Sequence, residues 1–446
     1  MATYNLRSRK LDPQNTEREE MKENSFAKAD TSRLTFTDEE DRPAMSKPTN
    51  IKLFGWSFNT AIAATHVNIF LYATCFWIQT GALPYLTKKL GVDMVVFGYL
   101  QTTFAVVQLA GGPLFGRFGD LFGGRAAMIL AFTSASATYL FLGLADSFPL
   151  LFISRLPSVF MHAMQGGQMI VTDMGDKEQR AASLGMLGLS YGVGMVVGPF
   201  IGGLITKFFS EQTAAFAAFL GSLLSIVFAY FFTPKKTKKA SVTSTIEEKP
   251  SSVFDVKKIV RLVMAPGAMF LLIIRAAAGI PIGVFQSMFS VVALETFKLP
   301  PEQNGYILSY IGVLTMIVQG LGVGVLTKKY SETSILKWSS FSLIFSYLAL
   351  SFVTDVQQLC IVIAPLVMGL ASSNIVISSA LTRTVSELDT GAMLGLNMAV
   401  NSFIRSLSPT VGGILLKYYG FASFGYLGFV MLTGVTIFLF LRMKDV

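Results

Sequence analysis

The chain of 446 residues is 52% hydrophobic and only 14% charged, which is too apolar for a soluble domain and typical of a protein that crosses a membrane many times. Its two cysteines lie in apolar runs and its two histidines have no cysteine or carboxylate at ligand spacing, so neither a disulfide framework nor a metal site is expected. The net charge of +9 predicts basic cytoplasmic loops rather than nucleic-acid binding. No nucleotide-binding loop or nucleophile motif is found, so we expect neither an enzyme nor a cofactor.

Residues 1–53 are polar, mix acidic and basic side chains and contain no apolar run, which predicts a disordered cytoplasmic tail. No signal for cleavage by signal peptidase is found at the start, so the first span is expected to act as the signal. Twelve apolar segments follow, each about long enough to cross a bilayer as a helix, and they predict an all-α membrane protein with twelve transmembrane helices. The expected spans are 57–82, 94–115, 126–145, 149–171, 183–206, 213–233, 266–293, 304–326, 335–354, 358–381, 391–416 and 421–441.

Alternate loops differ in their content of lysine and arginine, and the richer set is expected in the cytoplasm. Both termini are then cytoplasmic, in the plasma membrane or an endomembrane. The sequence predicts an N-terminal six-helix bundle over 54–233, a cytoplasmic linker over 234–265, a C-terminal six-helix bundle over 266–441 and a cytoplasmic C-terminus over 442–446.

The end of the linker, residues 252–262, mixes basic and apolar side chains. Two interpretations stay open. The segment is either a short amphipathic helix on the inner leaflet, with its lysines facing anionic lipid, or a charged flank that stops translocation.

The segment 183–206 carries glycines at every fourth position. They are Gly194, Gly198 and Gly202, with Gly203 directly after the last. At this spacing they lie on one face of a helix and let a neighbouring helix approach closely. Pro199 lacks an N–H and leaves the carbonyl of residue 195 without its helical partner. We therefore expect this face to be buried against protein.

The two halves of the chain repeat each other. Gly98-Tyr-Leu recurs as Gly305-Tyr-Ile 207 residues later, and Pro199 is matched by Pro409 210 residues later. The glycine pair after Pro199 is matched by Gly412 and Gly413. Parallel repeats of this kind place the substrate near the middle of the membrane, between two halves that rock against each other.

Two stretches resemble motifs of the major facilitator superfamily. Gly116-Arg-Phe-Gly-Asp120-Leu-Phe-Gly123-Gly-Arg125 resembles its cytoplasmic loop motif, in which Asp120 and Arg125 are implied to lock the halves together. Residues 194–203 resemble the antiporter motif on the fifth helix of its drug–proton antiporters.

A narrower resemblance covers about residues 60–440. The stretches 98–104, 154–157, 252–255 and 389–413 are similar to the organic cation transporter-like members of solute carrier family 22. This resemblance implies a secondary transporter that exchanges organic cations or drug-like amphipathic molecules for protons by alternating access.

Charged residues inside spans cost at least about 2.5 kcal/mol each and are functional candidates by default. They are Arg155, Arg275 and Arg405, in the fourth, seventh and eleventh segments. In the major facilitator fold these helices border the central cavity, so the resemblance implies a substrate or coupling cluster. The alternatives are a structural hydrogen bond to helix carbonyls for Arg155, and side chains that reach the interface for Arg275 and Arg405.

No Asp or Glu lies near the middle of any span, although a proton-coupled cation exchanger commonly uses such a carboxylate. An all-arginine cavity instead predicts an organic anion or an anionic lipid, bound by guanidinium groups. His66 and His162 either exchange protons or only pack. Other polar candidates, which either bind substrate or bridge helices, are Asn68, Gln101 and Gln286.

Two classes of function remain. The first is a secondary transporter of a small organic ion, coupled to protons. The second is a transport-inactive membrane scaffold that acts through its tail and linker on membrane lipids or on protein partners that the sequence does not identify.

Overall fold

The computed structural model describes residues 50–442, apart from 54–55, 175–179, 236–255, 266, 323–325, 327–328 and 387–388. The described part is helical except for one short antiparallel hairpin, in which Asn50–Leu53 (β1) pairs with Trp56–Asn59 (β2). β1 falls at the end of the segment 1–53 that we expect to be a disordered tail, and that expectation stays a prediction. Residues 1–49 of the predicted tail, most of the linker and residues 443–446 lie outside the described residues.

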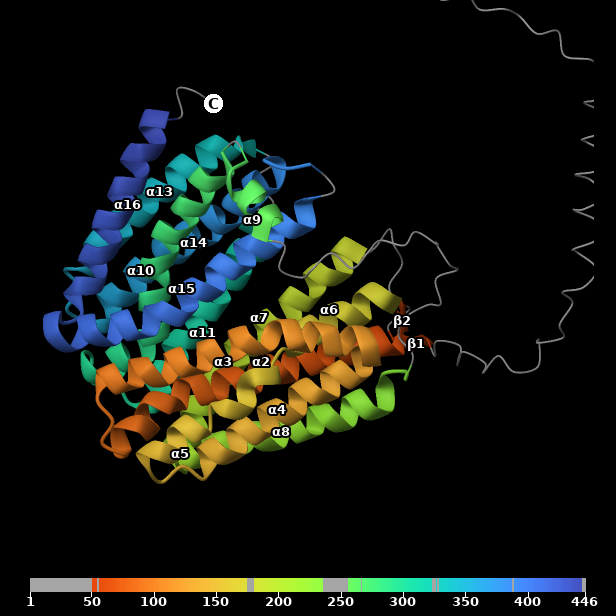
Figure 1. Ribbon diagram of the computed structural model, residues 1–446. Helices are drawn as coiled ribbons and strands as arrows, with labels where there is room; N and C mark the ends of the chain where they lie inside the picture. The colour runs from red at the N-terminus through yellow and green to blue at the C-terminus, as the bar shows by residue number, and fades with distance from the viewer. Residues whose placement is uncertain are drawn as a thin grey trace, which may run out of the picture. The chain divides into compact units, whose positions relative to one another are not determined.

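Figure 1 shows the helices in the described part of the chain, of which seven are long and apolar enough to cross a membrane. In chain order they are α2 (Thr60–Lys89), α3 (Met94–Phe122), α4 (Gly124–Gly143), α5 (Phe148–Ile153), the 3-10 helix η1 (Leu156–Phe160), α6 (Ala163–Met174), α7 (Arg180–Phe208), α8 (Glu211–Phe232), α9 (Val256–Val263), α10 (Ala268–Glu295), α11 (Pro301–Ile317), the π-helix η3 (Val318–Gly322), α13 (Glu332–Leu350), α14 (Val356–Arg383), α15 (Thr390–Tyr419) and α16 (Ala422–Arg442). We refer to α2–α8 as the N-terminal group and to α10–α16 as the C-terminal group.

The fourth predicted span, residues 149–171, is not one continuous helix. It is divided into α5, η1 and α6, with Arg155 between α5 and η1. Pro157 accounts for the first break, because it has no N–H to donate and disfavours α-helical geometry at the residue before it. The eighth predicted span also changes form, since α11 passes into η3 at Val318.

The glycine face of α7 packs against α2. A Cβ added at Gly194 would lie 2.6 Å from the Cβ of Ala73, and one at Gly198 would lie 2.6 Å from the carbonyl oxygen of Thr74. At Gly202 the same test gives 2.8 Å to the carbonyl oxygen of Ile78. Any side chain here would push the two helices apart, so the four-residue spacing sets how closely α2 and α7 approach.

The two groups meet at two helix crossings, α3 with α15 and α7 with α11, which Figure 1 shows side by side. In the first crossing, Gly98 faces the carbonyl oxygen of Pro409, 2.5 Å from the position of an added Cβ. In the second, Gly305 faces the carbonyl oxygen of Pro199. The two crossings therefore use the repeated sequence elements with their roles exchanged.

The hydrogen bonds at the two crossings also come from repeated positions. Thr102 and Thr410 share a hydrogen bond of 2.8 Å between their hydroxyl oxygens in the α3–α15 crossing. Ser309, 207 residues after Thr102, donates to the carbonyl oxygen of Val196 at 2.7 Å in the α7–α11 crossing. Each crossing is thus fixed by close backbone approach and by one hydroxyl bond.

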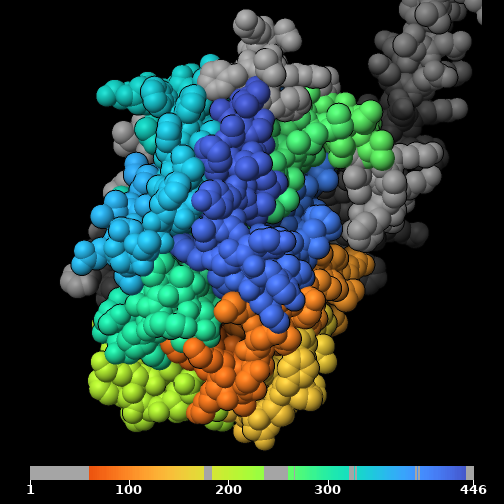
Figure 2. Space-filling model, turned by 90° about the vertical axis from the view of Figure 1, so that its left-hand side faces the viewer, coloured from red at the N-terminus to blue at the C-terminus, as the bar shows by residue number. Residues whose placement is uncertain are grey.

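Beyond these crossings, the ends of α2, α3, α7, α10, α11 and α15 come together in what we call the junction. Three ion pairs between described residues join the groups there: Lys88–Glu295 at 3.0 Å, Lys207–Glu302 at 2.9 Å and Lys417–Asp93 at 2.8 Å. Figure 2 shows this meeting of the early helices, in orange, with the blue and teal helices of the C-terminal group. Lys207 and Lys417 are 210 residues apart, so two of the pairs also come from repeated positions.

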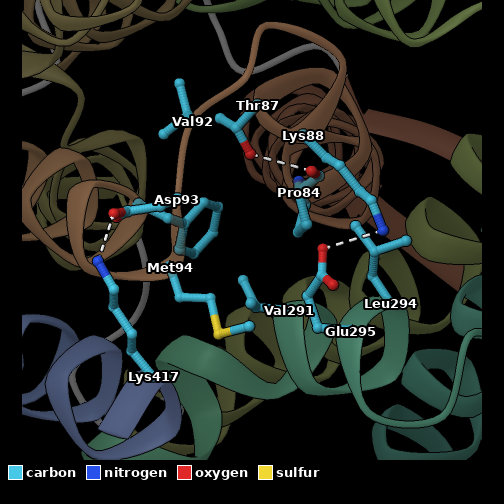
Figure 3. A pocket seen from close by; sticks show the side chains of 11 residues that line it. Pro84, Thr87, Lys88, Val92, Asp93, Met94, Val291, Leu294, Glu295 and Lys417 are labelled. Atoms are coloured by element: carbon cyan, nitrogen blue, oxygen red, sulfur yellow. Dashed lines mark hydrogen bonds and ion pairs between the residues drawn. The ribbon is translucent and has the colours of Figure 1, made fainter.

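A cavity of about 200 Å³ opens at the junction between two of these ion pairs. Figure 3 shows the Lys88–Glu295 pair on one side of it and the Asp93–Lys417 pair on the other. Its apolar lining includes Phe97, which is 3% exposed and belongs to a core cluster shared by both groups.

Candidate functional site

The C-terminal group contains a second cavity, of about 220 Å³, between α10, α11, α14 and α15. Its charged and amide side chains are Arg275, Gln286, Gln319, Asn374, Asn401 and Arg405. The lining residues include no Asp or Glu, and the others are apolar, glycine or threonine. This cavity therefore presents positive charge and hydrogen-bonding groups against an apolar wall, which suits an amphipathic anion.

Arg275 is held in place by two amide side chains. Its Nε donates to Oδ1 of Asn401 at 2.9 Å, and its Nη1 donates to Oδ1 of Asn374. The side chain is half-buried. The two asparagines fix the direction of the guanidinium, and its charge has no carboxylate partner among the described residues.

Arg405 differs from Arg275 in that no hydrogen bond or ion pair is found for its side chain among the described residues. It lines the cavity from α15 and is exposed. It is also within electrostatic range of Tyr72, Tyr191 and His162, which belong to the N-terminal group. Arg405 is therefore a cation that reaches from one group toward the other with its hydrogen-bond donors available.

The predicted polar residues are divided between the two groups. Gln286 lines the cavity and is exposed in it, whereas Gln101 is half-buried on α3. Asn68 is fully buried on α2, and neither of its amide atoms has a hydrogen-bond partner in the described structure. The structure brings together Arg275, Arg405 and Gln286, and it leaves Gln101 and Asn68 outside this cavity.

Arg155 lies in the N-terminal group and is only 1% exposed. Its guanidinium lies over the ring of Phe104, 5.7 Å from the ring centroid. Its Nε and Nη2 atoms have no hydrogen-bond partner among the described residues, so these atoms do not make the structural bond to helix carbonyls that we considered. Arg155 is a separate feature and not part of the cavity around Arg275 and Arg405.

The two histidines each make a contact within the N-terminal group. Nδ1 of His66 lies 3.0 Å from Oγ of Ser190 on α7, and Nε2 of His162 lies 3.1 Å from the carbonyl oxygen of Gln108. The His162 ring also packs on Phe115, with centroids 5.4 Å apart. His162 is the one of the two for which an electrostatic interaction with Arg405 is found in the described structure.

Comparison with known proteins places the chain in a family. Residues 65–388 match the Major Facilitator Superfamily. The chain belongs to this superfamily. It is a transporter of that class and a multi-pass helical membrane protein.

Relatives of this superfamily member cover most of its length. It is 41% identical to mouse solute carrier family 22 member 18 over 82% of this chain and 91% of that protein. It is 23% identical to multidrug resistance protein 2 of Bacillus subtilis over 82% and 92%. The crystal structure of the human organic anion transporter TETRAN superposes with a TM-score of 0.59 at 16% identity, over 84% of this chain and 99% of that one, which supports the fold alone.

The superfamily's loop motif lies at the turn between α3 and α4. Gly123 has a φ of 85°, a conformation that favours glycine, and it ends α3 by donating its N–H to the carbonyl oxygen of Gly119. Arg125 lies over the ring of Tyr230 on α8, 4.6 Å from its centroid. Gly116 faces the amide of Gln165, and Asp120 is exposed at the end of α3. Its implied role as a lock with Arg125 stays a prediction.

Glycines of the C-terminal group repeat the close approach seen in α7. A Cβ at Gly413 would lie 2.6 Å from the carbonyl oxygen of Met94, and one at Gly412 would lie 2.6 Å from Cγ of Met288. Gly203, the equivalent of Gly413, faces the carbonyl oxygen of Pro301 at 2.8 Å. These glycines and Pro409 therefore lie where helices cross.

Sequence reasoning missed Asn401 and Tyr191. Asn401 precedes Arg405 by four residues on α15 and so lies on the same face, a spacing that was visible in the sequence. Tyr191 is on α7, and its proximity to Arg405 depends on how the two groups pack. No local pattern points to it.

Proposed function

We propose that this superfamily member is a secondary transporter of organic anions, or of amphipathic molecules that carry an anionic group. The observation that carries the proposal is Arg405, whose donors have no partner among the described residues and which lies beside Arg275 in a cavity with no lining carboxylate. Guanidinium groups bind carboxylate, sulfate and phosphate through paired hydrogen bonds. The apolar wall of the cavity suits the rest of an amphipathic molecule.

We further propose twelve transmembrane helices in two parallel six-helix repeats. This is supported by the exchanged contacts of Gly98 with Pro409 and of Gly305 with Pro199. In this layout α5, η1 and α6 together make one span, as do α11 and η3. The distribution of lysine and arginine supports cytoplasmic termini, which puts the junction on the opposite side of the membrane. The described structure is then a state closed at the junction.

A second candidate is exchange of organic cations or drug-like molecules for protons. It is supported by the relative named multidrug resistance protein and by a series of aromatic contacts in the N-terminal group. The rings of Phe76 and Trp77 have centroids 5.7 Å apart, and those of Phe76 and Phe104 are 6.2 Å apart. Aromatic faces attract cations, and His66 or His162 then has to exchange the proton.

The test is uptake into proteoliposomes that contain the purified protein, with an imposed pH gradient. A panel of organic anions is compared with a panel of organic cations, for the wild type, Arg405→Gln and Arg275→Gln. Lys235→Gln, which removes an exposed charge outside the helices, is the matched control. We expect anion uptake that falls at least about tenfold in Arg405→Gln, because a hydrogen bond to a charged group contributes about 1.5–3 kcal/mol.

Other outcomes decide between the remaining functions. Gradient-driven cation uptake that survives Arg405→Gln would overturn the anion proposal in favour of the second candidate. No uptake of either class, by protein that is folded, would favour the transport-inactive scaffold.

A further inference from the structure

The position of Arg155 presents a physical problem. It is the largest of the side chains that are less than 2% exposed, and it carries a full positive charge. A guanidinium has five N–H donors, and here Nε and Nη2 have no hydrogen-bond partner among the described residues. Leaving a buried charge unpaired costs several kcal/mol. The ring of Phe104, at 5.7 Å, offers only a weak compensation on one side.

Tyr139 is a second buried polar side chain that acts electrostatically on Arg155. It lies on α4, is fully buried, and its hydroxyl also has no hydrogen-bond partner in the described structure. Tyr139 is within electrostatic range of Arg155, and no carboxylate among the described residues is found to act on either of them. Two fully buried side chains from neighbouring elements, since α4 contacts η1, therefore each carry polar groups without a hydrogen-bond partner among the described residues.

We propose that Arg155 and Tyr139 form a binding site for a small monovalent anion of the size of chloride. A halide accepts hydrogen bonds from several donors at once, so it satisfies Nε, Nη2 and the Tyr139 hydroxyl together and neutralises the guanidinium. The 1% exposure of Arg155 excludes a large organic molecule, and Arg155 does not line the cavity that holds Arg275 and Arg405. The ion is therefore distinct from the transported substrate.

The break in the fourth segment explains how the site is formed. Arg155 lies between α5 and η1, and its own carbonyl is occupied, since it accepts from the N–H of Ser158 at 3.2 Å and from the Ser158 hydroxyl at 2.6 Å. The hydroxyl of Ser134 on α4 donates to the carbonyl of Pro157 and ties this break to the helix that carries Tyr139. Bound anion then stabilises the packing of α4 against this break.

The test measures thermal unfolding of the full-length protein in detergent, in sodium chloride and in sodium gluconate of equal ionic strength. We expect chloride to raise the unfolding temperature of the wild type in a saturable way, because a ligand that binds only the folded state stabilises it by mass action. Arg155→Gln is expected to lose this response. In gluconate it should be at least as stable as the wild type, since it removes an unpaired buried charge.

Tyr139→Phe keeps the shape of the core and provides a second test of the anion site if Arg155→Gln does not fold. We expect it to raise the half-saturating chloride concentration about tenfold, as for the loss of one hydrogen bond to a charged group. Arg275→Gln is the matched control and should keep the full response, because Arg275 is bound by Asn374 and Asn401. Loss of transport in Arg275→Gln with an intact chloride response would thus show that the substrate cavity and the anion site are separate.

Three results would overturn the anion site. One is no chloride-dependent stabilisation of the wild type. Another is an equal response in the wild type and Tyr139→Phe. The third is an unfolding temperature of Arg155→Gln that lies below that of the wild type by the same amount in both salts. This is the behaviour of a purely structural arginine.

Discussion

The junction and the interior of the helix groups differ in whether their basic side chains have carboxylate partners. At the junction each lysine that joins the groups has a carboxylate partner, as in Lys207–Glu302 and Lys417–Asp93, and the lysines are 46% and 41% exposed. In the interior, Arg275 and Arg155 are half-buried and fully buried, and neither has a carboxylate partner in the described structure. Exposed pairs are weak and exchange readily with water, so they suit a contact that forms and breaks. Unpaired interior cations suit the binding of anions.

The largest expected effect comes from breaking the junction through its backbone approach rather than its charges. In Gly203→Val the new Cβ would lie 2.8 Å from the carbonyl oxygen of Pro301 and 2.9 Å from the Cα of Glu302, and backbone atoms cannot move aside as a side chain can. Overpacking of this kind costs about 1–3 kcal/mol or more. We expect the junction to stay open and transport to be lost, measured by uptake and by labelling of Phe97→Cys with a membrane-impermeant thiol reagent.

Gly188→Val on the same helix is the control, because no atom lies within 4 Å of its added Cβ. Its labelling and its transport should match those of the Phe97→Cys protein that keeps both glycines. If Gly203→Val leaves residue 97 as protected as before, the α7–α11 crossing does not control closure of the junction.

The next effect concerns how Arg275 is held. Asn374→Leu removes the acceptor of Nη1 and leaves a half-buried guanidinium N–H without a partner. We expect a loss of about 1–3 kcal/mol in the free energy of unfolding, measured by thermal or denaturant unfolding. In the background of Arg275→Met the same substitution should cost much less, because the group that it orphans is gone. Equal losses in both backgrounds would show that Asn374 acts through packing and not through Arg275.

The sequence predicted much of this organisation, for reasons that can be located. Apolar segments and the repeated Gly and Pro positions are local patterns, so they pointed to the membrane helices and to a repeat. That Gly98 and Gly305 lie at the crossings of the two groups is seen only in the structure. The division of residues 149–171 was not foreseen, because a proline such as Pro199 is accommodated inside α7 whereas Pro157 ends a helix. Whether a helix continues through a proline depends on the groups packed around it.

The candidate site shows the same limit. Buried charge identified Arg155, Arg275 and Arg405 from the sequence as candidates. It did not separate Arg155 from the other two, since which of these side chains line one cavity depends on contacts across several helices. Nor did it indicate that Arg275 is hydrogen-bonded by two asparagines, while no hydrogen-bond partner of Arg405 is found in the part of the chain that the structure describes. Such differences depend on side chains that are more than a hundred residues away or on other helices.

The smallest effect is expected from the charge pairs themselves. The hydrogen bond from Lys417 holds the pKa of the Asp93 carboxyl below its usual value, helped by the N–H of Val96. A carboxyl whose pKa is lower in the folded state adds stability above its unfolded pKa of about 3.9, and that stability is lost as the pH falls through the folded pKa. Asp93→Asn should therefore weaken the junction only slightly and equally between about pH 5 and 8.

Labelling of Phe97→Cys across this pH range measures the effect. Because the Asp93 and Lys417 side chains are 47% and 41% exposed, water competes for both, and the increase in labelling should be far below that of Gly203→Val. The wild-type pair should open only at pH values below about 4, where Asp93 gains its proton. If labelling already rises between pH 7 and 5 and Asp93→Asn abolishes this rise, the junction responds to protons in the physiological range. The weak, exposed pairs would then act as a proton sensor, and the coupling carboxylate that no span carries near its middle would have to be sought at the junction.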